Sequence, residues 1–187
     1  MNARRRMRRR KSLLIVSGMI LLAGVVTADH LGLFLVADTD DMAAYHGRTV
    51  SVVRVVDGDT IEIDVPDALA GRPTTSVRLI GLDAPEQHHD RAEPEPLADE
   101  ATDFVRKTIN GQNVTLRLES HRTRGSFGRV LAHVELPDGR LLNELILEAG
   151  LAQLEERWPH NHLVTYAQRQ QTAQQREVGL WAEDDLR

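Results

Sequence analysis

The sequence of 187 residues contains no cysteine. This absence excludes disulfides, thiolate zinc sites, cysteine nucleophiles and a lipid carried on an N-terminal cysteine. Any bound metal ion must therefore be held by oxygen atoms or by histidine nitrogen atoms. Two enzyme domains are also excluded, because a single domain usually takes about 100–200 residues. The 41% of hydrophobic and 27% of charged residues fit one soluble globular domain with an N-terminal extension.

Acidic residues are missing from the first 11 positions, which carry seven arginine and lysine side chains. The formal net charge of −5 hides this asymmetry, because the remainder has 16 basic residues against 28 acidic ones. So acidic a folded part disfavours tight nonspecific binding to nucleic acid, which depends largely on neutralising phosphates. A nucleic-acid site in this chain must therefore be locally positive.

Residues 12–28 form an apolar run with no charged residue. A basic segment followed by such a run is typical of a Sec export signal, and small residues allow cleavage after Ala28. As a helix the run would be about 25 Å long, close to the ~30 Å hydrocarbon layer, so a retained membrane anchor stays open. A buried helix of the domain is disfavoured by the flanking cations. We expect residues 1–28 to be a signal peptide or membrane anchor of an extracytoplasmic protein, either secreted or anchored.

Residues 29–46 are predicted to be a polar linker, and residues 47–187 to be the folded domain. Runs of β-branched residues predict strands, and apolar residues at helical spacing predict helices. The predicted elements are strands over 49–56, 61–65, 75–80, 113–118 and 129–136, and helices over 97–109, 141–149 and 164–178. Five strands with a helix between the third and fourth indicate an α+β fold. We expect mainly a five-stranded OB-type barrel with three helices, preceded by an N-terminal hydrophobic helix.

Two pairs of carboxylates stand at predicted turns, Asp57-Gly58-Asp59-Thr60 and Asp83-Ala84-Pro85-Glu86. Adjacent strands would bring these two turns together. Hard divalent cations bind oxygen ligands, and two aspartates with a backbone carbonyl suit Ca²⁺ better than a metal that prefers nitrogen. Asp59 and Asp83 are the candidate ligands. The alternative is purely structural, because aspartate and glycine favour tight turns in any case.

Two arginines add a candidate phosphate site. Arg78 alternates with the apolar Val77 and Leu79 on the third predicted strand, and Arg129 starts a later strand. A guanidinium group offers a planar fork to phosphate oxygens and stays charged in any environment. Taken alone, each arginine is more commonly a solvated strand residue.

The joint pattern of these segments resembles the staphylococcal nuclease, or thermonuclease, family. The resemblance runs from about residue 49 to residue 181, nearly the whole predicted domain. The segments that carry it occur in the family's order: Asp57-Gly58-Asp59-Thr60, Val77-Arg78-Leu79-Ile80-Gly81-Leu82-Asp83-Ala84-Pro85-Glu86, Phe127-Gly128-Arg129, Leu142-Asn143-Glu144, Gly150-Leu151-Ala152 and Gly179-Leu180-Trp181.

The resemblance implies a Ca²⁺ site formed by the carboxylates of Asp59 and Asp83 and by the carbonyl oxygen of Ala84. It implies that Glu86 orients or deprotonates the attacking water. A cation beside guanidinium groups would neutralise the charge that develops on a phosphorane, so this division of roles is physically sensible.

The resemblance also implies that Arg78 and Arg129 hold the scissile phosphate. The expected activity is Ca²⁺-dependent hydrolysis of phosphodiester bonds in DNA, with RNA as a second candidate substrate. We expect a monomer that contacts the membrane only through an uncleaved N-terminal segment.

Five positions depart from the family's pattern. The family often has threonine where this chain has Ala84, but only the backbone oxygen is needed for the metal. Gly125 stands where the family usually has aspartate, and Phe127 where it often has tyrosine. Glu156 and Trp158 occupy the stretch where two tyrosines line the nucleotide pocket of the founding branch. Trp158 is predicted to bind substrate by stacking on a base, and Glu156 to repel a terminal phosphate if it points inward.

Two other functions are weighed against the nuclease. One is a noncatalytic OB-fold module that binds nucleic acid or protein, and the other is a barrel that binds an envelope polysaccharide. Retention of all five catalytic residue types disfavours the first. The loop His88-His89-Asp90 is not expected to bind metal, because no helix or strand fixes its geometry.

Overall fold

Short strands rich in β-branched residues build the centre of the molecule. The computed structural model describes residues 36–87, 94–109 and 111–182. In β3 (Thr60–Ile63), Ile61 and Ile63 are buried while Glu62 between them is partly exposed, as expected for a strand with one covered face. β4 (Thr75–Leu79) breaks this rule at one position, because Arg78 is buried together with its apolar neighbours.

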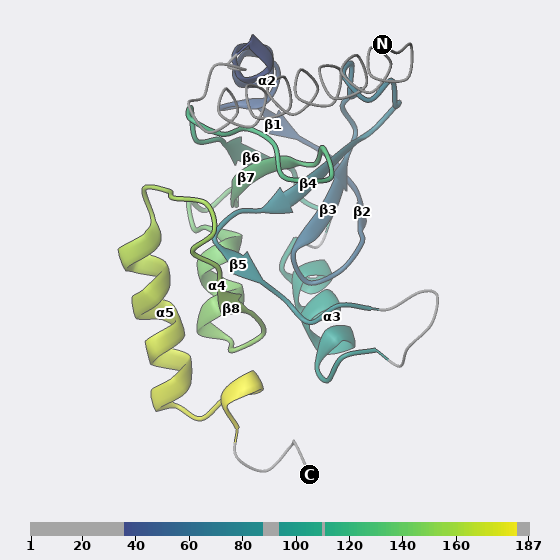
Figure 1. Ribbon diagram of the computed structural model, residues 1–187. Helices are drawn as coiled ribbons and strands as arrows, with labels where there is room; N and C mark the ends of the chain where they lie inside the picture. The colour runs from purple at the N-terminus through teal and green to yellow at the C-terminus, as the bar shows by residue number, and fades with distance from the viewer. Residues whose placement is uncertain (1–35, 88–93, 110, 183–187) are drawn as a thin grey trace, which may run out of the picture. The chain divides into compact units, whose positions relative to one another are not determined.

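Six strands form one sheet in the order β1-β6-β7-β4-β3-β2. The strands not yet bounded are β1 (Thr49–Val50), β2 (Val52–Val55), β6 (Val114–Arg117) and β7 (Val130–Glu135). Neighbouring strands run antiparallel except β4 and β7, which are parallel. The two outer strands, β1 and β2, are separated along the chain by Ser51 alone, so the sheet curls back on itself as a barrel (Figure 1).

Three helices cover one end of this barrel (Figure 1). They are α3 (Ala98–Ile109), α4 (Leu142–Glu148) and α5 (Leu163–Gln175). α4 lies between the other two and contacts α3, α5 and β7. In α3 the buried residues recur every three or four positions, acidic residues stand in the first turn and basic ones in the last, an arrangement that complements the helix dipole.

A second, two-stranded sheet lies between the barrel and the helices. It pairs β5 (Leu82–Asp83) with β8 (Gln153–Leu154) in antiparallel register, with Asp83 opposite Gln153. The chain closes with a short 3₁₀ helix, Gly179–Trp181. This small sheet fixes the direction in which the chain leaves β4.

The fully buried side chain of Asn143 joins α4 to the sheet. Its Nδ2 donates to the carbonyl oxygen of Ile80 at 3.0 Å, and its Oδ1 accepts from the backbone N–H of Val134 at 2.9 Å. Ile80 directly follows β4, and Val134 lies within β7. The asparagine of the Leu142-Asn143-Glu144 motif therefore has a structural role, since it satisfies buried backbone groups.

A cluster of polar rings is buried between β7 and α5. His133 is 2% exposed, and its Nδ1 lies 2.6 Å from the hydroxyl of Tyr166 while its Nε2 lies 3.2 Å from Oε1 of Glu119. The rings of His160 and His162 lie 5.3 and 4.5 Å from that of His133. Burial, with the neighbouring histidines, lowers the pKa of His133 to about 4, so the imidazole is neutral near pH 7.

The predicted α+β barrel is confirmed, but its strand count is not. The segment expected to be one strand, 49–56, divides at Ser51 into β1 and β2, and the pairing of β5 with β8 was not predicted. The three predicted helices are present with slightly different ends. The expected N-terminal hydrophobic helix and the histidine loop at 88–90 lie outside the described residues. No helix within the described ranges combines the length and apolar character needed to cross a bilayer.

The stretch expected to be a linker is different in the structure. Residues Val36–Tyr45 form helix α2, and residues 40–187 make up one compact unit. Tyr45 is 2% exposed, and its hydroxyl lies 3.1 Å from Oγ1 of Thr75. Asp41 is equally buried. Tertiary contacts at two positions thus order a segment whose polar sequence carries only a weak helical pattern, and the folded unit begins before Gly47.

Candidate active site

The turn between β2 and β3 fixes the first aspartate of the candidate site. The Oδ1 atom of Asp57 accepts from the backbone N–H of Asp59 at 3.0 Å, which holds the turn in shape. A Cβ atom at Gly58 would lie 2.7 Å from the Cβ atoms of both Ala84 and Ala101, so no larger residue fits without a shift. The close approach of this turn to Ala84 brings the two aspartate motifs together.

Asp59 is the buried anchor of the site, at 1% exposure. Its Oδ2 accepts from the backbone N–H of Ala84 at 3.0 Å, and its Oδ1 accepts from Oγ1 of Thr60 at 2.8 Å. Nη1 of Arg78 lies 2.5 Å from the same Oδ1. Burial raises the pKa of Asp59 to about 7, because desolvation outweighs the attraction of Arg78. Further positive charge at this point would therefore stabilise the ionised carboxylate.

Arg78 connects the two aspartates. It stands opposite Thr60 in the β3–β4 register, and its Nη2 pairs with Oδ1 of Asp83 while Nη1 pairs with Asp59. Burial opposes the charged form, but Asp59 and Asp83 outweigh it and raise the pKa of Arg78 above its usual range. Within the described residues its buried Nε has no hydrogen-bond acceptor. One buried N–H of this guanidinium is thus without a partner among these residues.

Arg129 reaches the site from the neighbouring strand. The parallel register places Val130 of β7 beside Val77 of β4, so Arg129 immediately precedes the strand at the level of the Arg78 segment. Its Nη1 donates to Oγ1 of Thr60 at 3.1 Å, and Thr60 in turn donates to Asp59. The guanidinium carbon also lies 5.6 Å from the ring centroid of Phe127, which is 86% exposed.

Glu86 stands apart from the other predicted site residues in its contacts. Its side chain is exposed, and its backbone N–H donates to Oε2 of Glu95 at 3.0 Å. No contact among the described residues joins its carboxylate to Arg78 or to either aspartate. The predicted site residues therefore divide into three groups: Asp59, Asp83, Ala84 and Arg78 are in direct contact, Arg129 joins them through Thr60, and Glu86 stands nearby in sequence without a contact.

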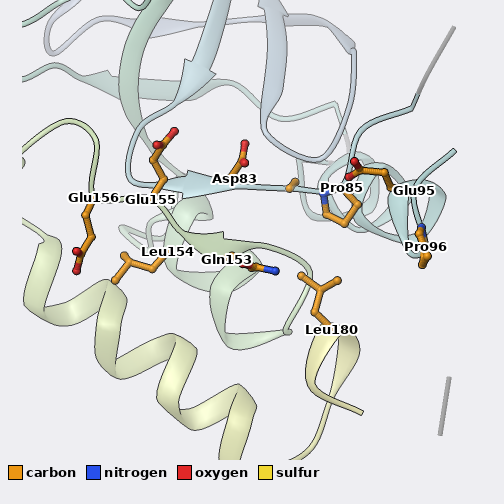
Figure 2. A pocket seen from close by; sticks show the side chains of 10 residues that line it. Asp83, Pro85, Glu95, Pro96, Gln153, Leu154, Glu155, Glu156 and Leu180 are labelled. Carbon is orange, nitrogen blue, oxygen red and sulfur yellow. The ribbon is translucent and has the colours of Figure 1, made fainter. Parts of the chain in front are cut away.

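An acidic groove of about 560 Å³ opens beside Asp83. Figure 2 shows that the carboxylates of Asp83 and Glu155 point to the same side of the small β5–β8 sheet, whereas Glu156 points away from Asp83. Glu95 lines the same groove. Glu156 lines this groove as well, and the carboxylates in it disfavour a phosphate there.

The structure does not favour the predicted stacking of Trp158 on a base. Trp158 is 7% exposed and packs with Ile80 and Leu131 in a small second core. An atom at the Cβ position of Gly125 would lie 3.5 Å from this indole ring, at ordinary contact distance, so the ring lies against the loop. Phe127 on the same loop is the exposed aromatic residue beside Arg129.

The donor set fits a hard divalent cation. The carboxylates of Asp59 and Asp83 meet at one guanidinium, and Asp57 adds a third negative charge that further raises the pKa of Asp59. Three carboxylates against the single guanidinium of Arg78 leave the cluster with a net negative charge. Their ligand atoms are oxygens, the donors that Ca²⁺ requires. Within the described part of the chain, no group of three or more histidine, aspartate or glutamate side chains is arranged as a metal cage. Backbone oxygen atoms and water must then complete the coordination.

Three residues that support the site were missed in the sequence. Asp41, Asp67 and Arg124 form a buried ion-pair cluster next to the loop that carries Arg129. They lie far apart in the sequence, and each stands in a segment expected to be a linker or a turn. The replacement of the family's loop aspartate by Gly125, beside an additional arginine, was the one available signal.

Comparisons with known proteins agree with this geometry. Residues 76–183 match the family described as staphylococcal nuclease homologue. The chain is 33% identical over 143 residues to an uncharacterized endonuclease of Escherichia coli, a match that covers 76% of this chain and 81% of that protein.

Two staphylococcal relatives carry the name thermonuclease. The one from Staphylococcus intermedius is 31% identical over 170 residues, which cover 90% of this chain and 94% of that protein. The one from Staphylococcus hyicus is 30% identical over 136 residues, or 72% of this chain and 76% of that protein. The family match, residues 76–183, extends from β4 over the loop that carries Arg129 and over helices α3, α4 and α5.

Proposed function

Because this chain belongs to the staphylococcal nuclease family, we propose that it is a Ca²⁺-dependent nuclease of the thermonuclease type. It hydrolyses phosphodiester bonds of DNA, with RNA as a further substrate. The observation that carries this proposal is the contact of one buried guanidinium, Arg78, with the carboxylates of both Asp59 and Asp83. An anion-binding group and a cation-binding pair thus meet at a single point, as phosphodiester hydrolysis requires.

The two arginines bind the phosphate that is cleaved. Arg78 exchanges a carboxylate for phosphate oxygens, and its unpaired Nε offers an additional donor. Arg129 binds the same phosphate from β7 and remains oriented by Thr60. Asp59, Asp83 and the Ala84 carbonyl would hold the ion, which would supply positive charge to stabilise the charge that develops on the phosphoryl oxygens. Preorganised charge of this kind provides most of the rate acceleration.

Glu86 orients the attacking water and accepts its proton. Its carboxylate is exposed and follows Asp83 by three residues in the chain, and in this proposal it meets a water molecule between the protein and the phosphate. A carboxylate in this role contributes about 10²- to 10⁴-fold to the rate.

The nucleic acid lies on the arginine side of the site. The acidic groove lined by Asp83, Glu95 and Glu155 repels the phosphate chain on one side. On the other side, Phe127 projects beside Arg129 and provides a surface on which a base can stack. In this arrangement the locally positive region of an acidic domain lies next to the scissile bond.

A nuclease assay on the whole chain tests the proposal. Single-stranded and plasmid DNA should be cleaved with Ca²⁺, and cleavage should stop with a chelator. Glu86→Gln and Arg129→Lys should each reduce kcat by at least about 100-fold.

The exposed Glu100 and Arg106 on α3 provide matched controls, because Glu100→Gln and Arg106→Lys make the same chemical changes away from the site. Both should retain full activity. Unchanged cleavage by Glu86→Gln and Arg129→Lys would refute the assignment, whereas Ca²⁺-dependent binding without cleavage would indicate a binding module.

We also propose that the nuclease is a monomer that works outside the cytoplasm. The basic residues 4–11 and the apolar residues 12–28 support export or membrane anchoring. Cell fractionation with an N-terminal sequence of the mature protein distinguishes a cleaved signal from a retained anchor, and light scattering on the purified protein measures its mass. Recovery of the intact chain in the cytosol would exclude export.

A further inference from the structure

The loop that carries Arg129 is held by few bonds of its own. Gly125 N–H donates to the carbonyl oxygen of Arg129 at 3.0 Å, and Gly128 N–H donates to that of Gly125 at 3.0 Å. Phe127 at the tip is 86% exposed and does not anchor the loop in the core. Because the site needs Arg129 in one direction, another group must restrict this loop.

Arg124, at the start of the loop, provides that restriction. Its Nη1 donates to the carbonyl oxygen of Gly128 at 2.8 Å. This carbonyl belongs to the peptide bond that joins Gly128 to Arg129. Fixing the plane of that peptide limits the direction in which the Arg129 side chain leaves the backbone.

Two buried aspartates hold the Arg124 side chain in turn. Its Nε and Nη2 each donate to Asp41 at 2.7 Å, and its Nη1 and Nη2 donate to Asp67 at 2.8 and 3.1 Å. The side chains of Asp41 and Asp67 are only 3% and 5% exposed. Asp41 also accepts from the hydroxyl of Thr123 at 2.9 Å. Every nitrogen of this guanidinium is therefore directed at a fixed acceptor.

The charges distinguish Arg124 from Arg129. Two carboxylates face its single positive charge, so the cluster is negative as a whole. The hydrogen bonds that Arg124 donates to Asp41 and Asp67 outweigh its burial and raise the pKa of the guanidinium above its usual range. No positive charge remains for a substrate, whereas Arg129 has a hydroxyl partner and an aromatic ring beside it.

We infer that Arg124 is a positioning residue for Arg129 and that Asp41 of α2, with Asp67, holds it in place. The inference rests on the proposed function of Arg129. By this inference, helix α2 before the barrel affects catalysis through Arg124 and Arg129. The same contacts explain how the loop keeps its order with Gly125 in place of an aspartate.

Two variants test the inference in the full chain, Arg124→Lys and Asp41→Asn. Each should lower kcat about 10- to 100-fold, because a small displacement of a positioned group has effects of this size. Arg117→Lys is the matched control, since Arg117 also makes a two-pronged contact with a carboxylate, that of Glu135, but on the exposed surface. It should change kcat less than twofold.

A double-mutant cycle separates positioning from general destabilisation. In an Arg129→Lys background, adding Arg124→Lys should lower the remaining kcat less than twofold, because the group to be positioned is already replaced. Equal losses in both backgrounds would mean that Arg124 only supports the fold, and the inference would be overturned.

Amide hydrogen exchange provides a readout that does not need activity. The amides of Gly125 and Gly128 should lose protection in Arg124→Lys and Asp41→Asn, while amides of β7 stay protected. If the wild-type chain proves inactive but the loop still opens in these variants, the proposed function fails and the support of the loop stands. Retained protection at both glycines would overturn the inference even in an active nuclease.

Discussion

Acidification should destabilise this fold through the buried imidazole of His133. The ring is enclosed by Tyr166, Glu119, His160 and His162, and burial lowers its pKa to about 4 from the ordinary 6.5. The unfolded chain therefore binds more protons than the native chain between these two pH values. The stability that His133 contributes is complete above pH 6.5 and is lost as the pH falls towards 4.

The size of the effect follows from the shift in pKa. A difference of about 2.5 units corresponds to a loss of about 3 kcal/mol, a large part of the 5–15 kcal/mol that stabilises a typical domain. His160 adds to the same window, because burial also lowers its pKa. Glu119 acts at lower pH: burial raises its pKa, but hydrogen bonds from Asn161 and His133 outweigh burial and hold it below its usual value.

Urea unfolding between pH 8 and pH 5, followed by tryptophan fluorescence with a chelator present, measures this loss. His133→Gln removes the titrating group but keeps an amide between the polar partners. The slope of its free energy of unfolding against pH should therefore be smaller, by the amount that corresponds to about one bound proton. His121→Gln is the control, because His121 is exposed. An equally steep pH dependence in His133→Gln and the wild-type chain would refute the reasoning.

Further predictions concern packing, backbone satisfaction, substrate binding and charge. Gly58→Ala should cost about 1–3 kcal/mol in urea unfolding, because the new methyl would lie 2.7 Å from two buried alanines; an unchanged midpoint would show that the turn can move. Asn143→Ala should cost about 1–3 kcal/mol by leaving the Val134 N–H buried without an acceptor, whereas Asn113→Ala at the surface should cost little. Phe127→Ala should raise KM for single-stranded DNA about fivefold or more without changing stability, given the value of one stacked base. At fixed Ca²⁺, turnover should first rise as salt is added from very low concentration, because the chain beyond residue 11 has 16 basic against 28 acidic residues; a rate that only falls would contradict this.

The elements with strong local patterns were predictable from the sequence. Alternation at Ile61 and Ile63 and helical spacing from Ala98 to Ile109 indicate their structures because burial follows the same periods. The pair β5 and β8 was not predictable, since each strand has two residues and exists only through its partner. The division of the first strand at Ser51 is likewise set by closure of the sheet.

The candidate site was predictable as far as short motifs determine it. Asp59, Asp83 and Arg78 lie in turns and strands whose register brings them together. The burial of Trp158 and the partners of Arg124 could not be predicted from the sequence, because both depend on contacts between distant segments. Asp41 and Arg124 are separated by 83 positions and meet only in the folded chain.

Closure of the barrel has a consequence for contacts between molecules. The outer strands of the six-stranded sheet, β1 and β2, contain two and four residues, and both come from one continuous stretch of chain. Edge strands this short offer a second molecule few backbone groups for pairing. They are therefore a poor template for an intermolecular β-sheet. An enzyme that works beyond the reach of cytoplasmic chaperones would thereby remain dispersed through its topology as well as its charge.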